Sequence, residues 1–354
     1  MRNPLPVRVG VRVGVVVGAV IGTVAIVVAT SVAVVAQSSA PGGAGRSGAR
    51  APARAYVQPK TPDGQPDLQG VWSNTTYVPL ERPAAVTKAY YTPEEAAAVI
   101  KAAASREAEQ TEPGTVADVH YDFSQFGLDR SQAARADNLR TSLIVDPDDG
   151  RIPPMTAEGR ARVAAREAAA KGVGRWDSAE SNQLDDRCLI MAGAGPPMMD
   201  TGYNSNYHIV QSPGYVMILT EMIHDVRIIP LDGRPAPPPG VRQWMGVSRG
   251  RWEGNTLVVE TTNFNGRNPF RNSSEHMKVI ERFTRTAEDV VVYRFTIDDP
   301  STWTRPWTGE MPMQKTVGPV FEHACHEGNY GLLNTLVGAR LDEQKAAGQA
   351  GPAR

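Results

Sequence analysis

The sequence predicts a mainly β protein with a helical insertion (α+β): an antiparallel, calycin- or lipocalin-like barrel or curved sheet with a C-terminal helix. From residue 207 onward, the 354-residue chain consists of short apolar segments of strand length. Turn sequences such as Ser212-Pro213-Gly214 and Glu253-Gly254-Asn255 separate these segments, which indicates antiparallel neighbours joined by short connections. Two capped helical segments precede this region and one helical pattern follows it.

The N-terminal residues predict the compartment. Three arginines among the first twelve residues are followed by an uncharged run, residues 14–36, that ends in small residues. This pattern is typical of a signal peptide, and the run is also long enough for a retained N-terminal membrane anchor, so residues 1–36 are expected to be one or the other. Either places the remainder in the periplasm or outside the cell. Residues 37–58 predict a disordered linker, and residues 59–354 predict a single exported β-rich domain.

The composition argues against several classes of protein. The formal net charge is −1 and charges of both signs are intermixed, so no nucleic-acid partner is expected. There is no Walker, Rossmann, H-E-x-x-H or EF-hand pattern, and the sequence predicts no cofactor and no metal site. Contact with a membrane is expected only through residues 14–36, and only if they are not cleaved. A small-molecule ligand is the expected partner, and the oligomeric state stays open.

Residues 75–200 differ from the rest of the domain, and we interpret them as an excursion of helices and loops that lies against the barrel. Thr92-Pro93-Glu94-Glu95 is a helix start, with a capping residue, a proline at the first helical position and acids in the first turn. Thr156 caps a second expected helix, Ala157 to Lys171. One strand is expected between the two helices, from Thr141 to Asp146.

The β region is framed by two further elements. Gly70-x-Trp72 resembles the G-x-W that opens lipocalin-type barrels, and residues 329–347 predict a C-terminal helix whose apolar face packs on the barrel wall. The strands expected between them are His208–Gln211, Tyr215–Ile229, Gln243–Trp252, Thr256–Asn263, Lys278–Thr284, Val290–Ile297 and Met313–Val317.

Alternation along the expected strand Tyr215–Ile229 indicates where chemistry could lie. If the side chains alternate regularly, Glu221 and Arg227 lie on one face and His224 lies on the other. Glu281 shares a face with apolar residues in a later strand. Two carboxylates in one barrel cavity would have raised pKa values, which suits acid/base catalysis near neutral pH.

Three functions are therefore open. The first is an exported enzyme that acts on a small organic or carbohydrate substrate by acid/base chemistry. The second is a binding module of the same architecture without chemistry, and the third is a structural protein of the cell envelope. The candidate catalytic residues are Glu221, Glu281, His224 and His208, and the candidate substrate-binding residues are Arg227, Tyr203 and Asn206.

Each candidate also has a structural interpretation. Either carboxylate can be paired with an arginine, for example Arg227 or Arg282, in a buried network. If both were paired in this bidentate way, or faced opposite sides of the sheet, the enzyme would lose its main support. A binding module would instead hold an apolar ligand among Met217, Leu219 and Phe283.

Cys188 and Cys325 are the only two cysteines, and in an oxidising compartment they predict one disulfide. This bridge would bring Asp185-Asp186-Arg187 beside residues 322–327, which contain two histidines. Such a cluster is either a His/carboxylate metal site or a solvated polar collar around the disulfide. The G-x-S-x-G match at residues 246–250 is followed by an expected hairpin, not a helix, which argues against a serine nucleophile elbow.

Five phrases spread over the domain carry a resemblance: PDLQGVW (66–72), VDPDDGRIPP (145–154), RIIPLDGRP (227–235), GRWEGNTLVV (250–259) and CHEGNY (325–330). With these phrases, the chain resembles a large family of exported bacterial proteins that carries no assigned activity. The resemblance implies a single co-linear exported unit. It contributes no catalytic residue.

Overall fold

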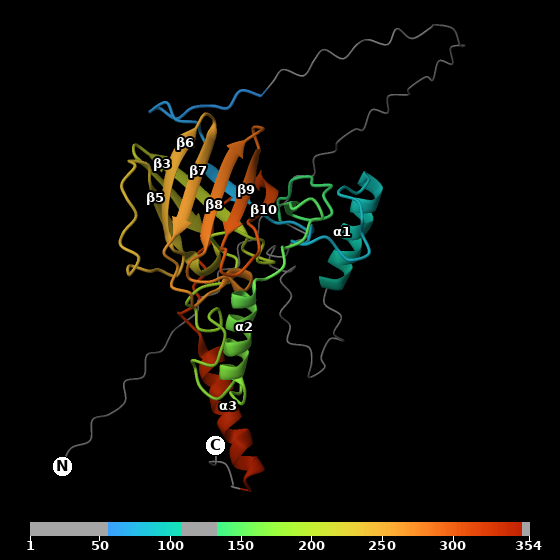
Figure 1. Cartoon of the computed structure of the whole chain (residues 1–354), viewed down its shortest axis with the longest axis vertical. Coiled ribbons are helices and arrows are strands. Elements are labelled where there is room, and N and C mark those ends of the chain that lie inside the picture. Colours follow the sequence, from blue (N-terminus) through green and yellow to red (C-terminus); the bar gives the residue numbers. More distant parts are fainter. Residues whose placement is uncertain (1–55, 108–132, 349–354) are drawn as a thin grey trace, which may run out of the picture. The chain divides into compact units, whose positions relative to one another are not determined.

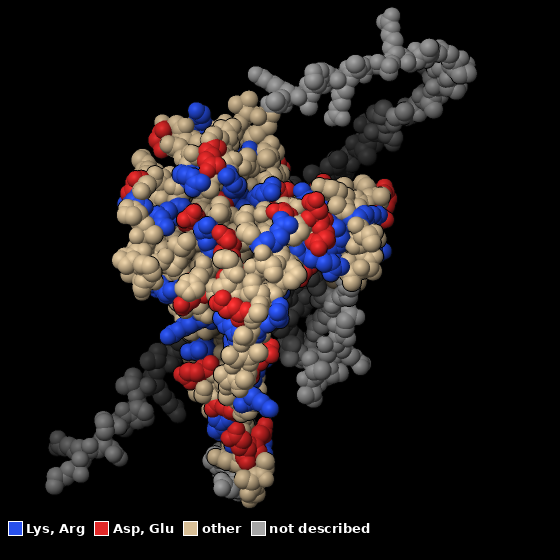
Figure 2. All heavy atoms as spheres, in the orientation of Figure 1, with Lys and Arg blue, Asp and Glu red and all other residues tan. Residues whose placement is uncertain are grey.

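The computed structural model describes residues 56–107 and 133–348 (Figure 1). The expected signal or anchor segment 1–36 and nearly all of the expected linker 37–58 lie outside these residues. Across the two described ranges, no helix has both the length and the apolar composition that crossing a membrane requires. Basic and acidic side chains are interspersed over the face shown in Figure 2, as the near-zero net charge predicts.

An antiparallel sheet curls into a nearly closed barrel, with its strands in the order β5-β4-β3-β1-β10-β9-β8-β7-β6 (Figure 1). The edge strands β5 and β6 lie next to each other at a seam where they are not paired. The short strand β2 pairs with β10. This architecture confirms the predicted fold class. The strands are β1 (Gly70–Ser73), β2 (Ile144–Asp146), β3 (Asn206–Ser212), β4 (Tyr215–Thr220), β5 (Val226–Pro230), β6 (Val247–Glu253), β7 (Thr256–Thr262), β8 (Lys278–Arg285), β9 (Val290–Asp298) and β10 (Trp307–Lys315).

Every second residue of each strand lines the barrel interior, because successive side chains in a strand point to opposite faces. Val279, Glu281 and Phe283 of β8 are buried, and their neighbours on β9 are the buried Tyr293 and Phe295. The rings of Phe283 and Tyr293 lie 5.0 Å apart between centroids, and those of Tyr293 and Phe295 lie 5.7 Å apart. Large buried rings contribute much of the apolar area of such a core. Glu281 therefore lies inside an aromatic core.

The segment Tyr215–Ile229 is not one strand, which corrects the sequence analysis. β4 ends before Glu221, and a turn follows in which Ile223 and His224 have φ values of 60° and 58°. A left-handed backbone is uncommon for residues with a side chain, and especially for the β-branched isoleucine. The turn folds β5 back against β4 as a hairpin.

This turn changes which residues share a face. Ile218 of β4 pairs with Arg227 of β5, and both are buried. Met217 and Leu219, which regular alternation along one strand would place on the same face as Arg227, point to the opposite side and are only half-buried. The alternation rule holds along an uninterrupted strand, and here it was applied across a break.

The barrel interior is filled by the chain itself. Residues 190–199 enter it, and Ala194 and Met198 are almost fully buried. The Tyr207 hydroxyl donates to the carbonyl oxygen of Ala194 at 3.2 Å, and the backbone N–H of Met198 donates to the Tyr293 hydroxyl oxygen at 2.9 Å. Part of the 75–200 excursion thus penetrates the barrel instead of covering it.

Three helices complete the described chain: α1 (Pro93–Glu107), α2 (Ala157–Ala170) and α3 (Tyr330–Ala346). The first two begin directly after their predicted capping residues, and Thr156 Oγ1 accepts the backbone N–H of Gly159 at 2.9 Å. The expectation that α3 packs on the barrel wall is wrong, because none of its residues is buried and Leu333 is 59% exposed. Apolar spacing gives a helix a face, but it does not supply the surface that would cover that face.

Candidate functional site

Glu281 and Arg227 form an ion pair inside the barrel. Arg227 Nη1 donates to Glu281 Oε1 at 3.1 Å, and Nη2 donates to Oε2, so the pair is bidentate. The Tyr293 hydroxyl donates to Glu281 Oε1 at 2.9 Å, and Arg227 Nη2 also donates to Ser248 Oγ at 3.1 Å. Both charged side chains are shielded from solvent, at 3% and 0% exposure. The contact to Ser248 crosses the seam, so this network also ties β5 to β6.

The electrostatics of this network favour the charged form of Arg227 and the neutral form of Tyr293. Desolvation acts to lower the pKa of Arg227, but the charge and hydrogen bonds of Glu281 outweigh it and raise that pKa. Burial, followed by the Glu281 charge, raises the pKa of Tyr293 well above its ordinary value. The Glu281 carboxylate is occupied by its hydrogen bonds to Arg227 and Tyr293. The structural interpretation of Glu281 therefore fits the geometry better than an acid/base role.

Glu221 lies in different surroundings from Glu281. Its Oε2 accepts a hydrogen bond from Asn206 Nδ2 at 2.6 Å, and its Oε1 accepts one from the backbone N–H of Phe321 at 3.2 Å. It lines a cavity of about 250 Å³ together with Tyr203 and Asn206, and Glu281 does not line that cavity. The structure thus brings together three of the predicted site residues and separates the expected pair of carboxylates.

The two candidate histidines are not part of either arrangement. His208 lies on β3 between its partners Val71 and Leu219, on the face opposite the buried Tyr207 and Ile209. His224 is exposed in the turn after Glu221. In the part of the chain that the structure describes, neither imidazole forms a hydrogen bond.

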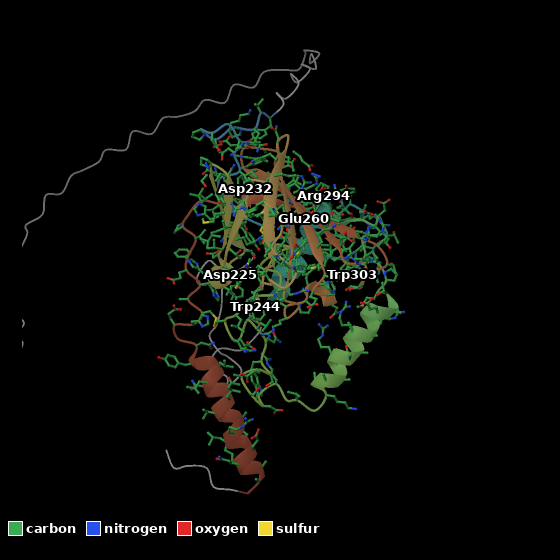
Figure 3. All side chains as sticks on the ribbon, turned by 60° about the vertical axis from the view of Figure 1, so that its left-hand side comes forward. Asp225, Asp232, Trp244, Glu260, Arg294 and Trp303 are labelled. Atoms are coloured by element: carbon green, nitrogen blue, oxygen red, sulfur yellow. A yellow bond between two sulfur atoms is a disulfide. The ribbon has the colours of Figure 1, made fainter. Side chains whose placement is uncertain are left out.

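A seam cavity of about 450 Å³ opens between β5 and β6. Asp225 and Trp244, which Figure 3 shows near each other at one end of the barrel, both line it. Burial raises the pKa of Asp225, and the neighbouring His224 partly offsets this. The Arg227 and Ser248 side chains form its inner wall, so the seam gives access toward the buried ion pair.

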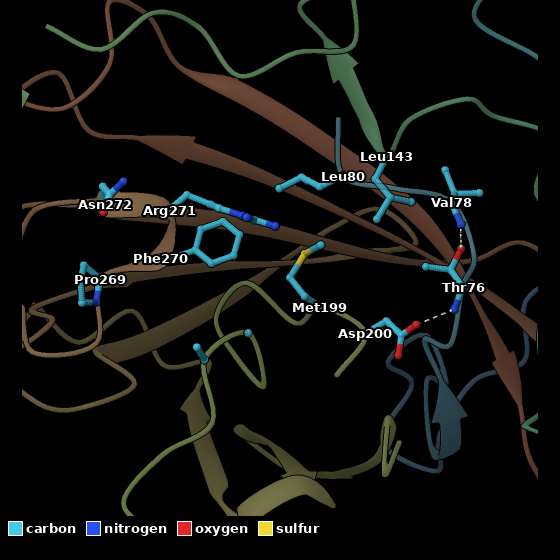
Figure 4. Close-up of a pocket in the computed structure, with 12 residues that line it drawn as sticks. Thr76, Val78, Leu80, Leu143, Met199, Asp200, Pro269, Phe270, Arg271 and Asn272 are labelled. Atoms are coloured by element: carbon cyan, nitrogen blue, oxygen red, sulfur yellow. Dashed lines mark hydrogen bonds between the residues drawn. The ribbon is translucent and has the colours of Figure 1, made fainter. Parts of the chain in front are cut away.

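The largest of the described cavities has a volume of about 580 Å³, within the range typical of small-molecule sites. We name it the Phe270 cavity. Its walls combine apolar and polar side chains, and Figure 4 shows the Arg271 side chain reaching into it on one side and Asp200 lying on the other. Asp200 is engaged, because its Oδ2 accepts the backbone N–H of Thr76 at 3.1 Å. The residues that line the cavity are Thr76, Val78, Leu80, Leu143, Ala192, Gly193, Met199, Asp200, Pro269, Phe270, Arg271 and Asn272.

The turn that presents Arg271 is strained and braced. Arg271 and Asn272 have φ values of 48° and 71°, a left-handed conformation that costs free energy for residues with side chains. The brace comes from α2, where Arg166 donates to Asn272 Oδ1 and Arg162 donates to the Asn272 carbonyl oxygen. Among the described residues, the Arg271 guanidinium has no hydrogen-bond or ion-pair partner. The Phe270 cavity therefore contains one guanidinium group that is available to a ligand, next to apolar side chains such as Phe270 and Met199.

Cys188 and Cys325 form the predicted disulfide, with Cα atoms 5.6 Å apart, and this confirms that pairing. A disulfide is typical of an oxidising environment such as that outside the cytoplasm. Around it, Asn329 Nδ2 donates to the carbonyl oxygen of Asp186 at 2.9 Å, and Arg175 pairs with the Asp186 carboxylate. Within residues 56–107 and 133–348, no group of three or more His, Cys, Asp or Glu side chains is placed to hold a metal ion.

Sequence reasoning missed the Phe270 cavity. Its walls come from segments far apart in the chain, around residues 78, 143, 199 and 270, so no local pattern marks it. One usable signal exists: residues 263–277 connect β7 to β8 and are too long for a tight hairpin. Long ordered connections of this kind often carry binding residues.

Comparison with models of protein families, with curated proteins and with solved structures found no match.

Proposed function

We propose that this protein is an exported binding protein whose Phe270 cavity holds a small amphipathic anion, such as an aromatic or aliphatic carboxylate, without chemical conversion. The observation that carries the proposal is the uncommitted Arg271 guanidinium at a cavity of ligand size that also offers apolar side chains. The mouth of a β-barrel is a common place for such sites.

The cavity suits a ligand with one charged end. Val78, Leu143, Met199 and Phe270 offer apolar surface for an alkyl or aryl body. The carboxylate end would lie at Arg271, because a guanidinium binds a carboxylate through two parallel hydrogen bonds. A dianion is disfavoured, since a second negative end would meet Asp200.

We do not propose acid/base catalysis by Glu281 and Glu221 as the function. Glu281 is occupied by Arg227 and Tyr293, and it lines none of the cavities described above. Neither candidate histidine lines the Phe270 cavity. Binding of a ligand requires only the apolar side chains and the Arg271 guanidinium, both of which the Phe270 cavity contains.

Titration calorimetry with matched acids and amides tests the proposal. The probes are octanoate and 4-phenylbutyrate, each compared with its primary amide, on the wild-type protein and on Arg271→Gln. An exposed charge-assisted contact contributes about 1 kcal/mol, so each acid should bind roughly fivefold more tightly than its amide. Arg271→Gln should remove that preference.

The matched control is Arg267→Gln, which makes the same change on the same connection at an exposed arginine outside the cavity. It should keep the preference for the acid. Equal affinities of acid and amide for the wild type, or no binding of any probe, would contradict the proposal.

A further inference from the structure

A second cavity is built around Glu221, a residue that is only 2% exposed to solvent. Its two carboxylate oxygens accept hydrogen bonds from an amide and from a backbone N–H, both of which are neutral. It forms no ion pair with another described residue, whereas the buried Glu281 is paired with Arg227. A buried carboxylate without a cation is costly, so this position is set up for a positive partner.

The rest of this cavity, which we name the Glu221 cavity, combines polar side chains with a smaller number of apolar ones. Hydroxyl and amide side chains from the end of β1, the start of β3 and the segment after β10 surround the carboxylate, and two aromatic side chains border them. These lining residues are Thr75, Tyr203, Asn204, Ser205, Asn206, Thr316 and Phe321. Such a lining offers hydrogen bonds to a hydroxylated ligand and ring faces to its C–H groups.

The wall of the Glu221 cavity is fixed by Asp200. Its Oδ1 accepts the backbone N–H of Gly202 at 2.9 Å and the Ser205 hydroxyl at 2.8 Å. These bonds hold a turn in which Asn204 has a φ of 49°. A polar wall held in an uncommon backbone conformation is preorganised, which lowers the entropic cost of binding a ligand.

We propose that the Glu221 cavity binds a small hydroxylated ammonium ion of the size of one amino sugar. The ammonium group would lie against the Glu221 carboxylate, which lines the cavity, and the ligand hydroxyls would meet the surrounding amides and hydroxyls. The volume of about 250 Å³ equals roughly eight water molecules in the liquid, which matches one monosaccharide unit.

Saturation-transfer NMR and titration calorimetry with D-glucosamine test this proposal, with glucose and N-acetylglucosamine as the uncharged comparisons. The full-length protein should bind glucosamine at least tenfold more tightly than either uncharged sugar. This comparison uses only the wild type, so it holds even if a variant fails to fold. Equal binding of the three sugars, or no binding of glucosamine, would overturn the proposal.

Two variants assign the binding to this cavity. Glu221→Gln keeps the size of the side chain, removes its charge and should weaken glucosamine binding at least tenfold. Glu260→Gln makes the same change on the outer face of β7 (Figure 3) and should leave binding unchanged. Glucosamine affinity that survives in a folded Glu221→Gln variant would place the cation elsewhere and refute the inference. Arg271→Gln should not affect it, which separates this test from that of the Phe270 cavity.

Discussion

Removing the charge of Glu281 distinguishes a structural role from a catalytic one. In Glu281→Gln, the Arg227 guanidinium stays buried but loses its counter-ion and one of its two strong acceptors. Breaking a buried ion pair on one side destabilises a protein by about 3–5 kcal/mol. For a domain of this size, about 2 °C of melting temperature corresponds to 1 kcal/mol, so the loss should be about 6–10 °C.

Differential scanning calorimetry of four variants measures this effect. Arg227→Met should lower the melting temperature by about as much as Glu281→Gln. The double variant Arg227→Met/Glu281→Leu should recover at least half of the melting temperature that either single variant loses. The recovery is incomplete because the Tyr293 hydroxyl then lacks its acceptor. The control is Arg282→Met on β8, the strand of Glu281; it breaks an exposed pair with Glu253 of β6 and should destabilise the protein by less than about 1 kcal/mol. A Glu281→Gln variant that melts within 2 °C of the wild type would refute the reasoning.

Two further predictions concern pH and the disulfide. Burial acts to raise the pKa of Asp299, but hydrogen bonds from three hydroxyl groups and one backbone N–H outweigh it and lower that pKa. Ionised Asp299 therefore stabilises the fold above its unfolded-state pKa of about 4, and this contribution is lost as the pH falls through the folded-state value. Asp299→Asn should lower the melting temperature most near pH 7, and a deficit that does not shrink below pH 4 would contradict the assignment. Because α3 buries no residue, Cys188→Ala/Cys325→Ala should release the segment after residue 325 to limited proteolysis while the barrel core stays protected. Cleavage of that segment at the wild-type rate would show that other contacts hold it.

The sequence was most informative where the chain is locally regular. Glu281 was placed on a buried face because β8 is uninterrupted, so the alternation holds along its whole length. The disulfide followed from having only two cysteines. Both predictions depend on rules that need no knowledge of distant contacts.

Prediction failed where the chain breaks its regular pattern without a sequence signal. The turn at Ile223 and His224 contains no glycine, asparagine or proline, and Asp225 at its end was a weak signal for the end of β4. The error misplaced Arg227 relative to Met217 and Leu219, although the structural alternative of a buried pair between a carboxylate and Arg227 occurs at Glu281. The Phe270 cavity was hidden for another reason, since its walls meet only after folding. For α3, the spacing predicted the helix correctly but could not show that its apolar residues lack a covering surface.

The most direct test of the central claim is a crystal structure of the protein with 4-bromobenzoate, read from the anomalous signal of bromine. The account predicts one strong bromine peak in the Phe270 cavity, between Phe270 and Met199, with the carboxylate at the Arg271 guanidinium. An ordered cavity without bromine, or the carboxylate bound with its ring outside the cavity, would contradict the account.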